Sequence, residues 1–83
     1  LNLIHSSRIH VLGAAEVAYV ERMEPSRRMH YATELVAGGP LGLIVAEGRS
    51  VPGELLQVAE QAALPVFTSP LASAQLIDLL RIY

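Results

Sequence analysis

The stretch that decides the fold is LGLIVAEG, residues 41–48 of an 83-residue chain. An uninterrupted apolar run extends from Leu41 to Ala46, preceded by Pro40 and followed by Glu47-Gly48. A short continuous apolar run between turn residues is typical of a strand covered on both faces, as in a parallel sheet. A membrane span needs about 20 such residues. The run is therefore predicted to form the central strand of a sheet. It is too short to span a membrane, so we expect no membrane partner.

Downstream of this run, helix and strand patterns alternate. Residues 52–64 (PGELLQVAEQAAL) have helical spacing, with Pro52 near the start and Pro65 past the end. The β-prone stretch Val66–Thr68 follows. Ser69-Pro70 then predicts the start of a last helix, with the Ser69 hydroxyl as its cap.

Upstream, the patterns predict a strand over residues 8–12, a helix over 14–23, and a second helix that begins at Pro25 and stops at Gly38-Gly39. The order is therefore β-α-α-β-α-β-α. It predicts an α/β fold, with a small parallel or mixed sheet of about three strands, flanking helices and right-handed crossovers. Residues 1–83 are expected to form a single domain, because so short a chain supports only one core.

Periodicity also predicts which side of each helix is buried. Apolar residues that recur at helical spacing are expected to face the sheet or a neighbouring helix. These positions are Val17 and Val20; Met29, Ala32, Leu35 and Val36; Leu55, Leu56, Ala59, Ala62 and Ala63; and Leu76, Ile77, Leu80 and Tyr83.

Composition excludes several chemistries. The chain has no lysine, which rules out a lysine-containing phosphate loop and Schiff-base catalysis, and no cysteine, which rules out thiol catalysis and cysteine-bound metals. A net charge of −2 offers no basic surface for nucleic acid. We therefore expect neither a nucleic-acid partner nor a bound cofactor in this chain.

Ligands of open parallel sheets bind beyond the carboxyl ends of the strands. Two loops expected at that edge predict an anion-binding site formed by Arg49, Ser50, Thr68 and Ser69 together with helix amides. The competing interpretation is purely structural: Gly48 makes a turn, the two serines cap helices, and Arg49 is solvated. The sequence leaves both interpretations open.

No catalytic or metal-binding constellation is predicted. His5, His10 and His30 lack the i, i+4 spacing of a helical metal pair; His10 is expected to be partly buried in a strand and His30 to lie on a helix surface. A serine hydrolase would need a nucleophile elbow, which is absent, and the sole aspartate, Asp78, falls within a predicted helix.

The two helices between residues 14 and 37 carry many charges. They form a predicted charged hairpin, which is either a solvated face or a contact surface for a partner or a neighbouring subunit. The charged residues concerned are Glu16, Glu21, Glu24 and Glu34 with Arg22, Arg27 and Arg28.

The order of several short motifs resembles a known family. RIHVLG at residues 8–13 is followed by Glu16, then by GLIVAEG at 42–48, a Pro52-x-Glu54-Leu55 helix start and a terminal amphipathic helix that ends at Tyr83. In this order and spacing they resemble the N-terminal domain of bacterial HPr kinase/phosphorylase. The resemblance covers nearly the whole chain and implies a fold like that of the Mur-ligase N-terminal domain.

The resemblance implies a noncatalytic regulatory or assembly domain of a cytoplasmic enzyme. The parent would phosphorylate and dephosphorylate a serine of the carrier HPr, with ATP and Mg²⁺ held by a separate C-terminal kinase domain, and would assemble into a hexamer. Because the chain begins at Leu1, it is expected to be a piece of that protein, truncated at its N-terminal side. Two alternatives stay open: a sensor for an anion or nucleotide sugar, and a structural oligomerisation module. The chain departs from the family pattern at Ala46-Glu47 and Thr68-Ser69, which weighs against a family-type anion site at this edge.

Overall fold

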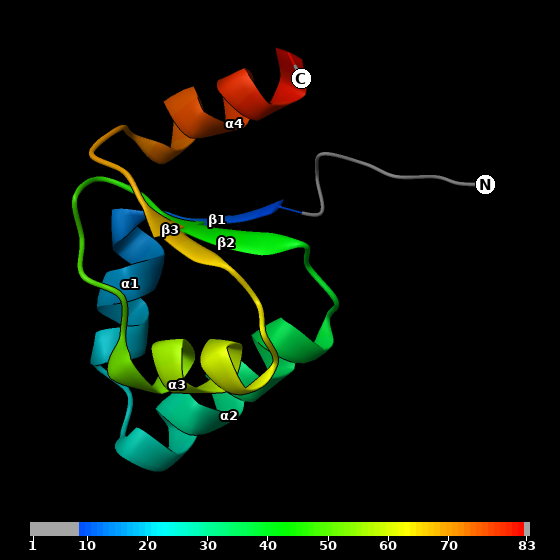
Figure 1. Cartoon of the computed structure of the whole chain (residues 1–83). Coiled ribbons are helices and arrows are strands. Elements are labelled where there is room, and N and C mark those ends of the chain that lie inside the picture. The colour runs from blue at the N-terminus through cyan, green and yellow to red at the C-terminus, as the bar shows by residue number, and fades with distance from the viewer. Residues whose placement is uncertain (1–8, 83) are drawn as a thin grey trace.

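The structure is a computed structural model that describes residues 9–82 (Figure 1). Strands and helices follow the predicted order β-α-α-β-α-β-α, so the expected α/β class is confirmed. The predictions made for His5, for the strand start at residue 8 and for Tyr83 lie outside the described residues. The elements are β1 (Ile9–Leu12), α1 (Ala14–Glu21), α2 (Pro25–Ala37), β2 (Gly42–Val45), α3 (Gly53–Gln61), β3 (Val66–Thr68) and α4 (Ser73–Ile82).

The sheet has three parallel strands in the order β1-β2-β3, so the stretch that decides the fold does form the central strand. Leu43 pairs with His10 on one side and with Val66 on the other. Figure 1 shows α1, α2 and α3 below the sheet and α4 above it. The connections from β1 to β2 and from β2 to β3 run in the same direction across the sheet, so helices on one face are expected for right-handed crossovers.

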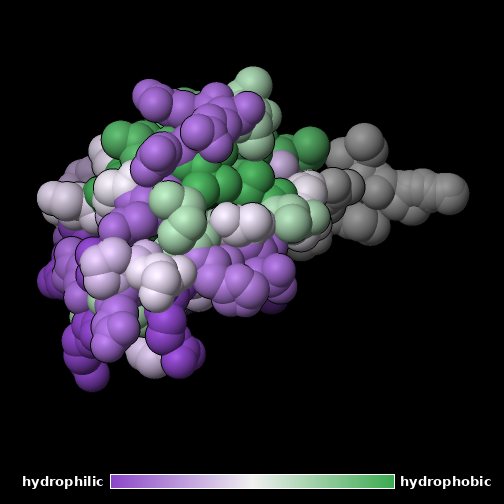
Figure 2. Space-filling model, turned by 90° about the horizontal axis from the view of Figure 1, so that it is seen from below, coloured by the Kyte–Doolittle hydropathy of each residue, from purple (hydrophilic) through white to green (hydrophobic). Residues whose placement is uncertain are grey.

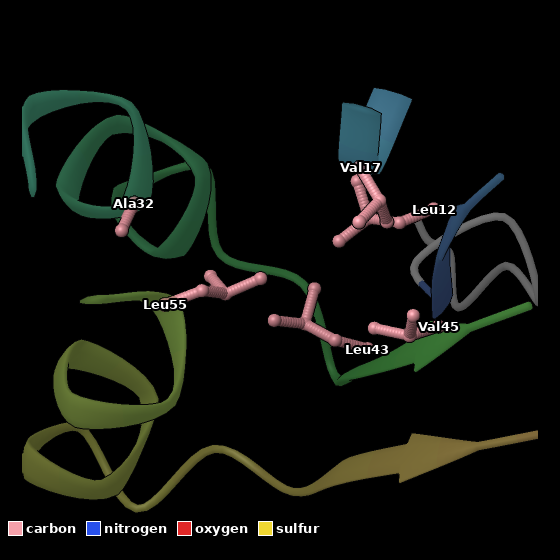
Figure 3. Packing of buried hydrophobic residues seen from close by; sticks show 6 residues of the cluster. All are labelled: Leu12, Val17, Ala32, Leu43, Val45 and Leu55. Atoms are coloured by element: carbon pink, nitrogen blue, oxygen red, sulfur yellow. The ribbon is translucent and has the colours of Figure 1, made fainter. Parts of the chain in front are cut away.

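The core lies between the sheet and the helices below it. Leu12, Leu43 and Val45 point from the strands toward Val17 of α1 and Leu55 of α3 (Figure 3). Leu43 and Val45 are 0% exposed, because side chains two residues apart on a strand share a face. The alternate residue Ile44 lies on the opposite face with its register partner Phe67, which is 58% exposed.

Helices α2 and α3 lie side by side below the sheet (Figure 1). Each contributes a small buried residue, Ala32 at 1% and Ala59 at 0% exposure. Small side chains let helix axes approach closely, and long side chains at these positions would hold them apart. The predicted burial of Ala32 is confirmed, and Gly39, in the left-handed region at φ 78°, follows the end of α2 as the predicted stop.

The prediction for the third helix was partly wrong. Helix α3 ends at Gln61, three residues earlier than expected, because Ala63 takes φ 55° and the Leu64 amide donates back to the Ala59 carbonyl at 2.8 Å. Ala62 and Ala63 are therefore exposed rather than buried. Leu56 is 43% exposed, since Leu55 and Ala59, together with the partly buried Val58, face the core.

The start of the last helix was also predicted wrongly. Helix α4 begins at Ser73, and the Ser69 hydroxyl accepts a hydrogen bond from the Leu71 amide at 3.1 Å, so it closes a turn instead of capping the helix. Leu76 is buried as expected, whereas Ile77 is 45% exposed. Helix α4 packs against β1 of the sheet. Among residues 9–82, no helix has both the length and the apolarity needed to cross a bilayer.

Candidate functional site

Backbone hydrogen bonds join the three loops at the carboxyl edge of the sheet. The Ala46 amide donates to the Leu12 carbonyl and the Ser69 amide to the Val45 carbonyl, both at 2.9 Å. Beyond the strand ends, the Gly48 amide donates to the Ser69 carbonyl at 2.9 Å. The structure thus places the loop that carries Arg49 and Ser50 directly beside the loop that carries Thr68 and Ser69.

The carboxylate of Glu47, which the predicted anion site does not include, lies at this edge. Glu47 adopts φ 60°, a conformation uncommon for residues other than glycine, and its Oε2 accepts from the Ala14 amide at 3.4 Å. Glu16 Oε1 accepts from the Gly13 amide at 3.2 Å. Two carboxylates therefore interact with the positive N-terminus of α1, where a bound anion would otherwise be stabilised. The sequence does not reveal this contact, because Glu47 and its partner amide are 33 residues apart.

A glycine permits the close approach of this loop to α4. A Cβ at Gly13 would lie 3.2 Å from Ser73 Oγ and 3.9 Å from Glu47 Oε2. His10 Nε2 lies 3.9 Å from Glu16 Oε2, and His10 is half-buried, as expected for a histidine in a strand. Helix α4 and the side chains of Glu16 and Glu47 therefore lie against the carboxyl edge of the sheet.

The four predicted anion-site residues occupy neighbouring loops, but two of their side chains already have partners. Arg49 Nη2 is 3.6 Å from Glu21 Oε1 at the end of α1, and Ser69 Oγ accepts from the Leu71 amide. The Arg49–Glu21 pair is largely exposed, so it holds Arg49 only weakly. Thr68 and Ser50 are exposed, and no side chain caps α3. The anion site stays a prediction.

A second charged cluster joins α2 to α3. Arg28 Nε lies 3.0 Å from Glu54 Oε2, and Arg28 Nη1 donates to the Met23 carbonyl at 2.6 Å. Both charged side chains are about three-quarters buried, at 24% and 23% exposure. The sequence analysis assigned Arg28 to the charged hairpin face, which is wrong, because its side chain turns inward to α3. A pocket of about 300 Å³ opens beside this pair and is also lined by Glu21 and by residues 51–53.

The pH dependence of the free energy of unfolding in acid should reveal the contribution of the Arg28–Glu54 ion pair. Hydrogen bonds from the Glu54 backbone amide and then from Arg28 hold the pKa of this carboxyl below its ordinary value of 4.5. The unfolded chain therefore binds the proton more readily than the folded chain does. The stability that ionised Glu54 supplies is complete above about pH 4.5 and is lost as the pH falls through the folded-state pKa.

We expect Glu54→Gln to be less stable than the unsubstituted chain at neutral pH, with the difference shrinking as the medium is acidified. Urea midpoints measured at a series of pH values provide the readout. Glu60→Gln removes a negative charge from the same helix and controls for net charge. Parallel pH curves for the unsubstituted chain and the Glu54→Gln variant would contradict the assignment.

The outer side of the α1–α2 hairpin carries two adjoining depressions, which together we name the hairpin surface. Their volumes are about 520 and 240 Å³. Both are lined by Tyr19, Met23 and Arg27; the first adds Arg22 and Glu24, and the second adds His30, Tyr31 and Glu34. Viewed from below, strongly hydrophilic residues gather at the left of the molecule, on the side of the α1–α2 turn (Figure 2).

Two tyrosines give the hairpin surface its apolar component. Tyr19 is 58% exposed, and Tyr31 is half-buried beside it. Burial, followed by the negative charge of Glu16 and by Tyr19, raises the pKa of the Tyr31 hydroxyl above its ordinary value of 10.0. The Tyr31 phenol is therefore neutral at physiological pH. His30 is exposed on α2, as predicted from the sequence.

Some charged side chains of residues 9–82 form ion pairs near the surface, such as Arg28 with Glu54 and Arg49 with Glu21. None of the polar or charged side chains of residues 9–82 is fully buried, and no three His, Asp or Glu residues of that range form a metal-binding group. These features define a small parallel α/β domain with a hydrogen-bonded carboxyl edge and a charged helical hairpin. The chain belongs to the family described as HPr Serine kinase N terminus, which matches residues 1–83.

Curated relatives agree with this membership. The chain is 48% identical over 83 residues to a protein named HPr kinase/phosphorylase from Bordetella avium, covering 100% of this chain and 27% of the relative. A protein of the same name from Burkholderia cenocepacia is 43% identical over 83 residues, with 100% of this chain and 26% of the relative covered. The chain thus spans about a quarter of these relatives. No solved structure matches it significantly.

Proposed function

We propose that this chain is a noncatalytic regulatory or assembly domain of an HPr kinase/phosphorylase. The observation that carries the proposal is the family match over residues 1–83, combined with a span of only 27% of the Bordetella avium relative. The whole enzyme would act in the cytoplasm, where it would use ATP and Mg²⁺ to phosphorylate a serine of HPr and would also remove that phosphate.

Chemistry supports assigning catalysis to another part of the enzyme. Phosphoryl transfer relies on cationic groups, commonly a lysine, on the phosphates and on side chains that hold Mg²⁺. This chain has no lysine. Among residues 9–82, the arginines with inward or partly covered side chains, Arg28 and Arg49, are paired with glutamates of the same chain. ATP, Mg²⁺ and HPr would therefore bind to the polypeptide outside this chain, principally to a C-terminal kinase domain.

Two measurements test this proposal. The purified chain, supplied with ATP, Mg²⁺ and HPr, should transfer no more phosphate than a sample without protein. Deleting the matching segment from the Bordetella avium relative should leave phosphate transfer measurable but change its regulation or the size of the assembly. Restoring that segment with this chain should reverse the change. Phosphate transfer by the chain alone, or a deletion without effect on regulation and assembly, would refute the proposal.

A second candidate function is supported by the adjacency of two loops. The hydrogen bond between Gly48 and Ser69 places Arg49 and Ser50 beside Thr68 and Ser69, an arrangement that could receive an anion or the phosphates of a nucleotide sugar. Binding would require Arg49 to leave Glu21. Thermal-shift titration with nucleotides, sugar phosphates and UDP-sugars should then raise the melting temperature, and Arg49→Ala should abolish the shift. No shift with any of these ligands would exclude the sensor.

A further inference from the structure

A tight turn over residues 46–49, which we name the edge turn, places two consecutive residues in the left-handed region. Glu47 has φ 60° and Gly48 has φ 67°, and the Arg49 amide donates to the Ala46 carbonyl at 3.2 Å. Positive φ at both central residues is the mark of a type I′ turn, which favours glycine, asparagine and aspartate at these positions. Glu47 therefore adopts a conformation that its residue type disfavours, so contacts outside the turn must stabilise it.

These contacts lead to the segment that precedes α4. The Glu47 amide donates to the Leu71 carbonyl and the Gly48 amide to the Ser69 carbonyl, both at 2.9 Å. The two acceptors belong to the loop between β3 and α4. Both hydrogen bonds depend on the edge turn, because its two central residues supply the donors.

Helix α4 has little other contact with the rest of the described chain. Of the helices in residues 9–82, α4 alone lies above the sheet, where it packs mainly against β1 (Figure 1). Leu76 is buried at 8% exposure, whereas Ile77 and Leu79 are each 45% exposed. A helix that buries so little apolar surface is the kind of element that opens locally while the rest of a domain stays folded.

We propose that the edge turn is a conformational switch for α4: the turn holds α4 on the sheet, and the two open together as one unit. Opening breaks the hydrogen bonds to Ser69 and Leu71, and it frees Glu47 from its unfavourable φ. Any change that favours or disfavours the turn therefore changes the fraction of molecules in which α4 is docked.

The switch deepens the second candidate function, and its regulatory meaning rests on that function. Arg49 is the last residue of the edge turn, and Ser69 accepts a hydrogen bond from the turn through its carbonyl. An anion held by these two residues would bind across the contact between the turn and the loop before α4. Binding would then be reported by the position of α4.

Two matched glycine substitutions test the coupling between the turn and the helix. Gly48→Ala puts a side chain at φ 67°, whereas Gly53→Ala, at the start of α3, does so outside the left-handed region. At both positions the added Cβ has no atom within 4 Å, so neither substitution creates crowding.

Native-state hydrogen exchange followed by NMR is the readout. In the unsubstituted chain, the amides of α4 should exchange faster than those of β2, because α4 opens by itself. Gly48→Ala should speed exchange in α4 by about five- to thirtyfold, which corresponds to the cost of the left-handed conformation for an L-residue with a Cβ. Gly53→Ala should not speed it.

Linkage provides a second test from the other end of the switch. Leu76→Ala weakens the packing of α4, so it should speed exchange of the Glu47 and Gly48 amides as well. Leu79→Ala removes the same atoms from an exposed side chain of the same helix, and it should leave those two amides unchanged.

Three results would each overturn the proposal. They are α4 amides as well protected as those of β2, no effect of Gly48→Ala on α4, and no effect of Leu76→Ala on the amides of the turn. All of these measurements use the chain without a ligand, whereas the sensor is tested by titration and the noncatalytic role by phosphate transfer. Failure of the switch and failure of either proposed function are therefore distinguishable.

Discussion

Leu43→Ala should lower the free energy of unfolding by about 2–5 kcal/mol. Leu43 is 0% exposed at the centre of the sheet, and its side chain points into the cluster formed with Val45 and Leu55 (Figure 3). The substitution removes buried methyl groups and leaves a cavity that strands on both sides keep from collapsing. A domain of this length is stable by only about 4–12 kcal/mol, so the loss approaches the whole stability.

Urea denaturation followed by circular dichroism measures this effect. Leu41→Ala is the matched control, because the same atoms are removed two residues earlier from a side chain that is 52% exposed. We expect the control to change the unfolding free energy by less than about 1 kcal/mol. Equal losses for the two variants would mean that Leu43 is not at the centre of the core.

Ala32→Leu should destabilise the chain by about 1–3 kcal/mol, although it adds apolar surface to a helix. Ala32 is 1% exposed within the core cluster, on the helix that lies beside α3. A leucine there must either displace α3 or adopt a strained rotamer. The expected direction is therefore opposite to the one that the added hydrophobicity alone predicts.

The control for this experiment is Ala37→Leu at the exposed end of the same helix. The substitution of leucine for alanine changes helix propensity little at either position. The difference in unfolding free energy between the two variants, measured by thermal or urea unfolding, therefore gives the effect of packing at residue 32. Ala37→Leu should stay within about 0.5 kcal/mol of the unsubstituted chain. An Ala32→Leu variant at least as stable as the unsubstituted chain would show that α2 and α3 can separate at little cost.

Local patterns accounted for the order of the elements and for the buried residues where a helix has one clear apolar side. Val17, Val20, Ala32, Leu55 and Leu76 were all assigned correctly. Errors arose where neighbouring elements decide the outcome. Helical spacing extends past Gln61, but the chain turns at Ala63 so that β3 can reach the sheet.

The charged residues were harder to predict than the core. Arg28 and Glu54 are 26 positions apart and meet only because α2 and α3 pack side by side. Glu47 reaches α1 because the sheet places the end of β2 beside the end of β1. The spacing of residues along the sequence predicts which side chains are neighbours on one helix or strand. It does not predict which side chains of different elements meet.

By itself, the sequence predicted that LGLIVAEG contains the central strand of a small α/β sheet, because a short apolar run between turn residues is stable chiefly when helices cover it. Because the chain has no lysine and no cysteine, its composition also excluded catalysis by these residues. Only the tertiary structure decided which charges are paired and which stay free on the hairpin surface. The physical reason is that ion pairing depends on distances of a few ångströms between side chains, and packing between elements sets those distances.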